Sequence, residues 1–137
     1  MLFPSHQDFS KKFVELSFSK IENPSNVKTK YAINKLNCHF SGKENFPDDG
    51  SIEHIVSEND GDFALNIGNL ILLEGPLNED AGNATYSDKL LFYKKSCYPW
   101  IAQFIADHNE WNQSMIDDRA KELSKTYYEK IFFKELT

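Results

Sequence analysis

The chain has 137 residues, of which 40% are hydrophobic and 14% aromatic, and its formal net charge is −6 at pH 7. This length suits one compact domain with its own core and is too short for two domains of ordinary size. The negative charge argues against a protein that holds nucleic acid through a broad basic surface, because such binding depends on many Lys and Arg side chains that neutralise phosphates. We therefore predict a single domain, residues 1–137, that contacts a phosphate backbone only locally or with help from a partner.

The two cysteines, Cys38 and Cys97, lie far apart and form no Cys-x-x-Cys pair. Their spacing fits neither a zinc knuckle nor a disulfide framework, so we expect reduced thiols and a cytoplasmic location. The N-terminus has no basic flank followed by an apolar core, and the longest apolar runs, such as residues 70–73, are far shorter than a membrane-spanning helix. We expect no membrane partner.

The first part of the chain, residues 1–45, is predicted to be helical. Ser5 and Asp8 have the spacing of a helix start. A helix of roughly three turns is then predicted by apolar residues that recur at four and three positions, namely Phe9, Phe13 and Leu16. A second helix is predicted by the stripe Ala32, Ile33, Leu36 and Phe40, and Gly42 would end it.

The middle part, residues 46–96, begins with turn residues at 46–50 and then shows two β-prone runs, at 51–57 and 63–73. Residues 59–61, Asn-Asp-Gly, separate the runs, which predicts an irregular hairpin. Pro76 fits the first turn of a short helix, and Thr85 or Ser87 can cap the next one.

The last part, residues 97–137, is again predicted to be helical. Pro99 begins a helix that carries Trp100, Ile101, Phe104 and Ile105. A long final helix is predicted by five apolar residues on one face, namely Ile116, Ala120, Leu123, Tyr127 and Ile131.

Polar residues in the middle part are the candidate site. Glu53 and His54 are neighbours in the first β-prone run, so an extended strand would point them to opposite faces. That separation suits an imidazole that handles a proton and a carboxylate that binds a cation. A single histidine in a strand is more often a hydrogen-bonded core residue. Here, however, Asn69 follows on the second run and Asn78 comes nine residues later, on the helix predicted to start near Pro76.

The ordered set Glu53-His54-Ile55-Val56, Asn69-Leu70 and Asn78 resembles the pattern of HNH (His-Me finger) nucleases. More narrowly, residues 67–73 with Asn78, Asn83 and Lys89 resemble the C-terminal nuclease domain of GmrSD-type restriction enzymes. The helical start of the chain and the run Ile116-Asp117-Asp118-Arg119 also resemble this family, so the resemblance covers most of the chain. The chain departs from the family pattern at Ser57, where proline is usual, and at Ile71, where threonine is usual.

The resemblance implies an α+β fold, in which a ββα-metal (His-Me finger) core is flanked by N- and C-terminal helices. It also implies a metal-dependent endonuclease in which His54 takes a proton from water and Asn69 fixes the hairpin that orients His54. One divalent cation, Mg²⁺ or else Mn²⁺, would be held by Glu53 and Asn78, with Asn83 as a second candidate ligand. Lys89 would contact phosphate, although a lysine on a helix is more often part of a solvated face. The Cys-x-x-Cys pairs of zinc-containing relatives are absent, so we expect no structural zinc and expect the flanking helices to brace the core.

The resemblance implies DNA as the substrate and a role in restriction or anti-phage defence. In the GmrSD type a nucleotide-hydrolysing, ParB-like portion precedes this domain, and no Gly-rich phosphate loop precedes the site here. We therefore expect a domain of a longer protein, or a small subunit whose protein partner supplies recognition. Two alternatives stay open, namely an RNA-directed HNH nuclease or toxin and a catalytically silent HNH-fold module that binds a protein.

Overall fold

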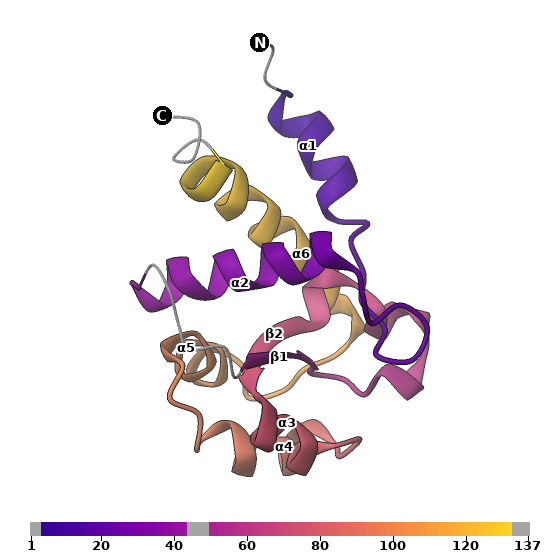
Figure 1. The fold of residues 1–137 in the computed structure, drawn as a ribbon, viewed down its shortest axis with the longest axis vertical. Coiled ribbons are helices and arrows are strands. Elements are labelled where there is room, and N and C mark those ends of the chain that lie inside the picture. Colours follow the sequence, from indigo (N-terminus) through magenta and orange to yellow (C-terminus); the bar gives the residue numbers. More distant parts are fainter. Residues whose placement is uncertain (1–3, 44–49, 133–137) are drawn as a thin grey trace.

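The computed structural model describes residues 4–43 and 50–132 (Figure 1). In these residues six α-helices surround a two-stranded antiparallel sheet, so the α+β fold class is confirmed. The principal elements are α1 (His6–Phe13), α2 (Val27–Ser41), β1 (Gly50–His54), β2 (Leu70–Glu74), α3 (Gly75–Ala81), α4 (Tyr86–Tyr93), α5 (Pro99–Asp107) and α6 (Gln113–Thr126). Three short 3₁₀ turns, η1 (Glu58–Asp60), η2 (Asp62–Leu65) and η3 (Ile67–Asn69), connect the strands, and a π-helical segment, η4 (Tyr127–Phe132), follows α6. The turn predicted at 46–49 lies outside the described residues.

The first helix is shorter than predicted. The Ser5 side chain accepts a hydrogen bond from the Asp8 amide at 3.1 Å, which confirms the predicted helix start. However, α1 has eight residues and ends at Phe13, whereas Leu16 was expected on the same helix. The chain leaves the helix because the main-chain oxygen of Leu16 accepts a hydrogen bond from the amide of Ile67, 2.9 Å away. Tertiary pairing with the segment before β2 thus replaces the last helical turn.

The second helix begins and ends as the sequence suggests. The Asn26 side chain accepts a hydrogen bond from the Thr29 amide at its start. At its end Gly42 adopts a left-handed backbone with φ 70°, which glycine tolerates better than other residues. The later helix starts at Thr85 and Pro99 are also confirmed.

The strands occupy only part of the predicted β-prone runs. In the hairpin Glu53 pairs with Ile71 and His54 with Leu70, but residues 55–57 and 63–69 lie outside the ladder. The side chain of Asn69 accounts for this difference. Its amide oxygen accepts a hydrogen bond from the Val56 amide at 2.9 Å, and its amide nitrogen donates to the Val56 oxygen at 2.9 Å. A side chain therefore satisfies the backbone groups that a longer strand would have paired.

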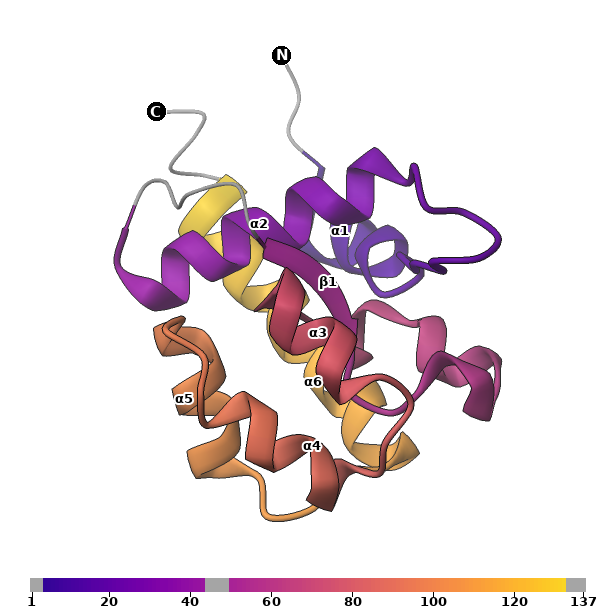
Figure 2. The same ribbon diagram turned by 60° about the horizontal axis from the view of Figure 1, so that its bottom comes forward.

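The flanking helices bury the hairpin from several directions. Helices α2 and α5 pack against β2, α3 packs against both strands, and α6 packs against η3 (Figures 1 and 2). Gly68 permits the approach of α6, because a Cβ atom at this position would lie 2.1 Å from the main-chain oxygen of Ile116. The five residues predicted to share one face of the last helix are all buried, although the backbone becomes π-helical after Thr126. No helix in residues 4–43 or 50–132 has the length and apolar character needed to cross a bilayer.

Candidate active site

His54 is the last residue of β1, and its side chain is buried against the connection between α1 and α2. Its Nε2 atom lies 2.6 Å from the main-chain oxygen of Phe18, and the two rings stack with centroids 6.0 Å apart. Because a carbonyl oxygen only accepts hydrogen bonds, Nε2 carries the proton when the imidazole is neutral. The other ring nitrogen, Nδ1, is then unprotonated and available as a base.

The surroundings of His54 favour the neutral imidazole. Burial lowers the pKa of His54, and nearby lysines lower it further, whereas the Phe18 carbonyl and the Glu58 carboxylate raise it in part. Oε1 of Glu58 lies 4.0 Å from Nδ1, and Oε2 of Glu58 accepts a hydrogen bond from the Ser19 hydroxyl at 3.0 Å. The basic nitrogen therefore faces a carboxylate that is held in place and would stabilise the imidazolium after proton uptake.

Glu53 points to the other face of the hairpin, as its alternation with His54 predicts. Its Oε2 atom accepts a hydrogen bond from the Tyr93 hydroxyl at 2.5 Å and lies 3.1 Å from Nζ of Lys89. Burial raises the pKa of Glu53, while the charge and hydrogen bond of Lys89 and the Tyr93 hydroxyl lower it. The carboxylate is thus a buried acid whose ionised form depends on two partners from α4.

Lys89 does not lie on a solvated face, because its side chain is fully buried. Besides the ion pair with Glu53, Nζ donates a hydrogen bond to the main-chain oxygen of His54 at 2.6 Å. One ammonium group therefore contacts both residues of the Glu-His pair. The phosphate contact expected of Lys89 stays a prediction. Lys89 and Tyr93 are four residues apart and so lie on the same face of α4. This spacing is the signal in the sequence that both side chains can reach one partner, here Glu53.

Asn78 lies on α3 beside β1 and is buried. Its amide nitrogen donates to the Ser51 hydroxyl at 2.9 Å and to the main-chain oxygen of Ile52 at 3.0 Å. These two bonds turn the amide oxygen to the opposite side, where it accepts a hydrogen bond from Nζ of Lys20 at 2.6 Å. The candidate ligand oxygen therefore already faces a cationic group.

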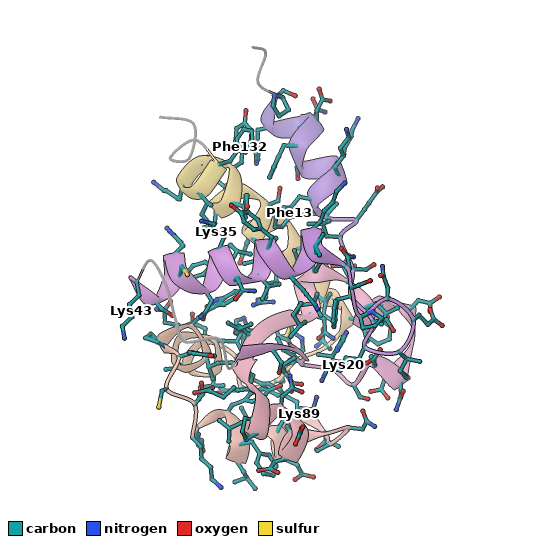
Figure 3. All side chains as sticks on the ribbon, viewed as in Figure 1. Phe13, Lys20, Lys35, Lys43, Lys89 and Phe132 are labelled. Atoms are coloured by element: carbon teal, nitrogen blue, oxygen red, sulfur yellow. The ribbon has the colours of Figure 1, made fainter. Side chains whose placement is uncertain are left out.

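Lys20 is a site residue that the sequence did not reveal. It lies in the connection between α1 and α2, 58 residues before Asn78, and no motif marks it. Burial dominates the pKa shifts of Glu53 and His54, but the Lys20 ammonium lowers the pKa of both groups as well. One flexible cation thus acts on three of the predicted site residues. Figure 3 shows Lys20 and Lys89 near the hairpin.

Asn83, the second candidate ligand, is exposed just after α3. Its amide oxygen accepts a hydrogen bond from the Ser57 hydroxyl at 2.9 Å. Ser57 stands where the family pattern usually has proline, so this contact is available because of the departure from that pattern. The role of Asn83 as a metal ligand stays a prediction.

Asn69 is fully buried and uses both ends of its amide. Besides its two bonds to Val56, the amide nitrogen donates to the Ala64 oxygen at 2.7 Å, and the amide oxygen accepts from the Trp111 indole at 3.1 Å. These bonds join the end of β1 to the start of β2 and to the segment before α6. Such a link is what the predicted role of Asn69, orienting the hairpin that carries His54, requires.

Arg119 supports the same region from α6. Its Nη1 atom donates to the main-chain oxygens of Gly68 and Leu70, both at 2.8 Å, and these residues flank Asn69. The guanidinium group also lies over three aromatic rings, those of Trp100, Phe104 and Trp111. The sequence marked Arg119 as part of a family-like run, but its contacts depend on how α6 packs.

The donor set fits a hard divalent cation. Among the described residues no group of three or more His, Cys, Asp or Glu side chains could hold a metal ion. The ligands expected from the sequence are one carboxylate, of Glu53, and one amide oxygen, of Asn78. Oxygen ligands suit Mg²⁺, which keeps several waters and is bound through few protein groups. The amide oxygen of Asn78 already accepts from an ammonium group, which supports its suitability for a cation.

Residues 3–126 match the family described as GmrSD restriction endonucleases, C-terminal domain. The matched region extends through the hairpin and ends with the last residue of α6. No curated protein and no solved structure shows significant similarity to the chain.

Proposed function

Because the chain belongs to the family of GmrSD restriction endonuclease C-terminal domains, we propose that it is a metal-dependent HNH endonuclease that hydrolyses DNA phosphodiester bonds. The observation that carries this proposal is the hydrogen bond between Nε2 of His54 and the Phe18 carbonyl. It fixes the tautomer in which Nδ1 is the basic nitrogen, at the end of the first strand of a β–β–α unit. The defence role and the partner or additional domain that supplies recognition belong to the same proposal.

In the proposed reaction, Nδ1 of His54 removes a proton from the attacking water, which then attacks the scissile phosphorus. The Glu58 carboxylate, 4.0 Å from Nδ1, stabilises the imidazolium that results. Asn69 positions His54 by tying the two strands together through its four amide hydrogen bonds. None of these three residues needs to move far, because each is already held by hydrogen bonds or burial.

The Glu53 carboxylate and the Asn78 amide oxygen would hold the cation, with Asn83 as a second candidate. When bound, a divalent cation would neutralise the charge that develops on the phosphate and on the leaving oxygen. Tyr93 and Lys89 both contact Oε2 of Glu53, so Oε1 is the oxygen we assign to the cation. Lys89 would thereby orient the ligand, and its phosphate contact is a further part of the proposal.

The test is cleavage of supercoiled plasmid by the full chain with Mg²⁺ or Mn²⁺, compared with EDTA. We expect metal-dependent nicking or linearisation that a His54→Ala variant loses by about a hundredfold or more, the usual contribution of a general base. His39→Ala is the matched control, because His39 is an exposed imidazole on α2. Equal cleavage by the two variants would refute the role of His54.

Substrate choice is tested with single-stranded RNA and DNA of the same sequence. Cleavage of RNA alone, lost in His54→Ala, would replace DNA with RNA as the substrate. Absence of cleavage of either polymer, together with no Mn²⁺ binding in a calorimetric titration, would favour the silent assembly module.

A further inference from the structure

A cleft lies beside the candidate active site, between β1 and the chain that connects α1 to α2. Its volume is about 420 Å³, within the range of small-ligand sites. The α1–α2 connection contributes Lys20, α2 contributes Lys30 and Asn34, and β1 contributes Ser51. The cleft therefore brings two lysines, one amide and one hydroxyl together beside β1.

The charge of this cleft differs from that of the whole chain. The chain has 21 acidic and 15 basic residues, yet among the residues that the structure describes none that lines the cleft carries a carboxylate. The Lys30 ammonium lies over the Phe18 ring, 5.8 Å from its centroid, which keeps the charge at the wall of the cleft. A locally positive cleft in an acidic protein attracts an anionic ligand and directs it to one place.

Three contacts join the cleft to the candidate active site. Lys20 lines the cleft and also bonds to Asn78, and Phe18 lines the cleft while its main-chain oxygen bonds to His54. Ser51 likewise lines the cleft and accepts a hydrogen bond from Asn78. A ligand in the cleft therefore lies directly beside His54, the proposed general base, and Asn78, the proposed metal ligand.

We propose that this cleft binds the sugar–phosphate backbone of one nucleic-acid strand, with Lys20 at the scissile phosphate and Lys30 at a neighbouring phosphate. The inference rests on the proposed function, because the polymer is the one that His54 would cut. Asn34 and Ser51 supply the neutral hydrogen-bonding groups that often accompany lysines in phosphate binding. An ammonium group has three donors, so Lys20 can contact the phosphate while it still donates a hydrogen bond to the Asn78 oxygen.

The test measures binding in EDTA, so that its result does not depend on cleavage. Fluorescein-labelled DNA and RNA oligonucleotides of one sequence are titrated with the full chain, and Kd is measured by anisotropy over a range of salt concentrations. We expect Lys20→Gln and Lys30→Gln each to weaken binding about five- to tenfold at about 0.1 M salt, because each lost phosphate contact lowers the salt slope by about 0.7 to 0.9.

The matched control is Lys35→Gln, which removes the same charge from the same helix. Lys35 lies five residues after Lys30, about 140° around the helix, and does not line the cleft. Figure 3 shows its position on α2. Thermal unfolding of each variant verifies that it is folded. Lys30→Gln removes the contact of the ammonium group with the Phe18 ring, and Lys35→Gln removes a similar contact with the Tyr31 ring, so the two variants are matched in this respect as well.

The outcomes separate this inference from the proposed function. A larger loss of affinity for the two cleft variants than for Lys35→Gln would support the cleft, and the probe that binds more tightly identifies the polymer. Equal affinities for all three variants, or no binding of either probe by the unmodified chain, would overturn the proposal that the cleft binds nucleic acid. This holds even if His54-dependent cleavage is observed. Conversely, cleft-dependent binding without any cleavage would retain the binding site and refute the endonuclease.

Discussion

Lys20 and Asn78 are joined by a hydrogen bond of 2.6 Å between the ammonium group and the amide oxygen. The two residues come from the α1–α2 connection and from α3, so the contact closes one side of the candidate active site. Because the same amide oxygen is assigned to the divalent cation, an ammonium group and a metal ion would compete for it.

The first prediction concerns this competition. Replacing Lys20 with Met removes the competing cation, so the affinity for Mn²⁺ should rise by about tenfold, equivalent to ~1.4 kcal/mol. Isothermal titration calorimetry without nucleic acid measures the change. Lys35→Met serves as the control and should leave the affinity within about twofold. A fall in affinity for Lys20→Met would mean that Lys20 supports the cation site instead of competing for it.

The second prediction concerns the buried pair of Glu53 and Lys89. Lys89→Met leaves the Glu53 carboxylate uncompensated in the core and should lower the free energy of unfolding by about 3–5 kcal/mol. The double variant Lys89→Met, Glu53→Gln removes both charges and should recover part of that loss. Urea unfolding measures the free energies. A double variant as unstable as the sum of the two single variants would contradict a direct interaction between them.

The third prediction concerns Arg119. Its replacement by Met leaves the buried oxygens of Gly68 and Leu70 without their donor, and should lower the free energy of unfolding by about 2–4 kcal/mol. Arg119→Lys should retain less than half of the free energy that Arg119→Met loses, because an ammonium group lacks the planar fork of donors. The exposed neighbour Lys121 provides the control, and Lys121→Met should change the stability by less than about 0.5 kcal/mol.

Arg119 has a second expected effect, on catalysis. Because its contacts hold the main chain on both sides of Asn69, Arg119→Lys should lower kcat more than it raises KM for the plasmid substrate. A purely structural role would lower the stability and leave the kcat of the folded fraction unchanged.

The fourth prediction concerns pH and the metal-free protein. Burial lowers the pKa of His54 below its ordinary value of 6.5, so below pH 6.5 the unfolded chain binds a proton that the folded chain does not. The free energy of unfolding should therefore fall as the pH falls through 6.5, and the stability contributed by neutral His54 is present above that value.

The comparison with His54→Gln isolates this effect. The other titratable groups are common to both proteins, so the difference between their unfolding free energies in EDTA reports on His54. Relative to the variant, the unmodified chain should lose stability between about pH 7.5 and about pH 5.5. A difference that is constant over this range would show that His54 has the same pKa in the folded and unfolded chain.

The family match over residues 3–126 confirms the resemblance read from the sequence. Local patterns also predicted the starts of several helices correctly, since Ser5, Thr85 and Pro99 act through hydrogen bonds or backbone angles within one turn. The boundaries of α1 and of the strands were wrong where a distant segment supplied the backbone partners, as Ile67 does for Leu16.

The sequence by itself determined the order of Glu53, His54, Asn69 and Asn78, and the alternation that sends Glu53 and His54 to opposite faces of a strand. Both follow from covalent spacing and from the period of a β-strand. Only the tertiary structure decided which groups surround them. Phe18 and Glu58 meet His54, Lys20 meets Asn78, and Lys89 with Tyr93 meet Glu53. Apart from Glu58, which is four residues from His54, these partners lie far apart in the chain. No local pattern encodes the distant contacts, because they form only when the helices bury the hairpin.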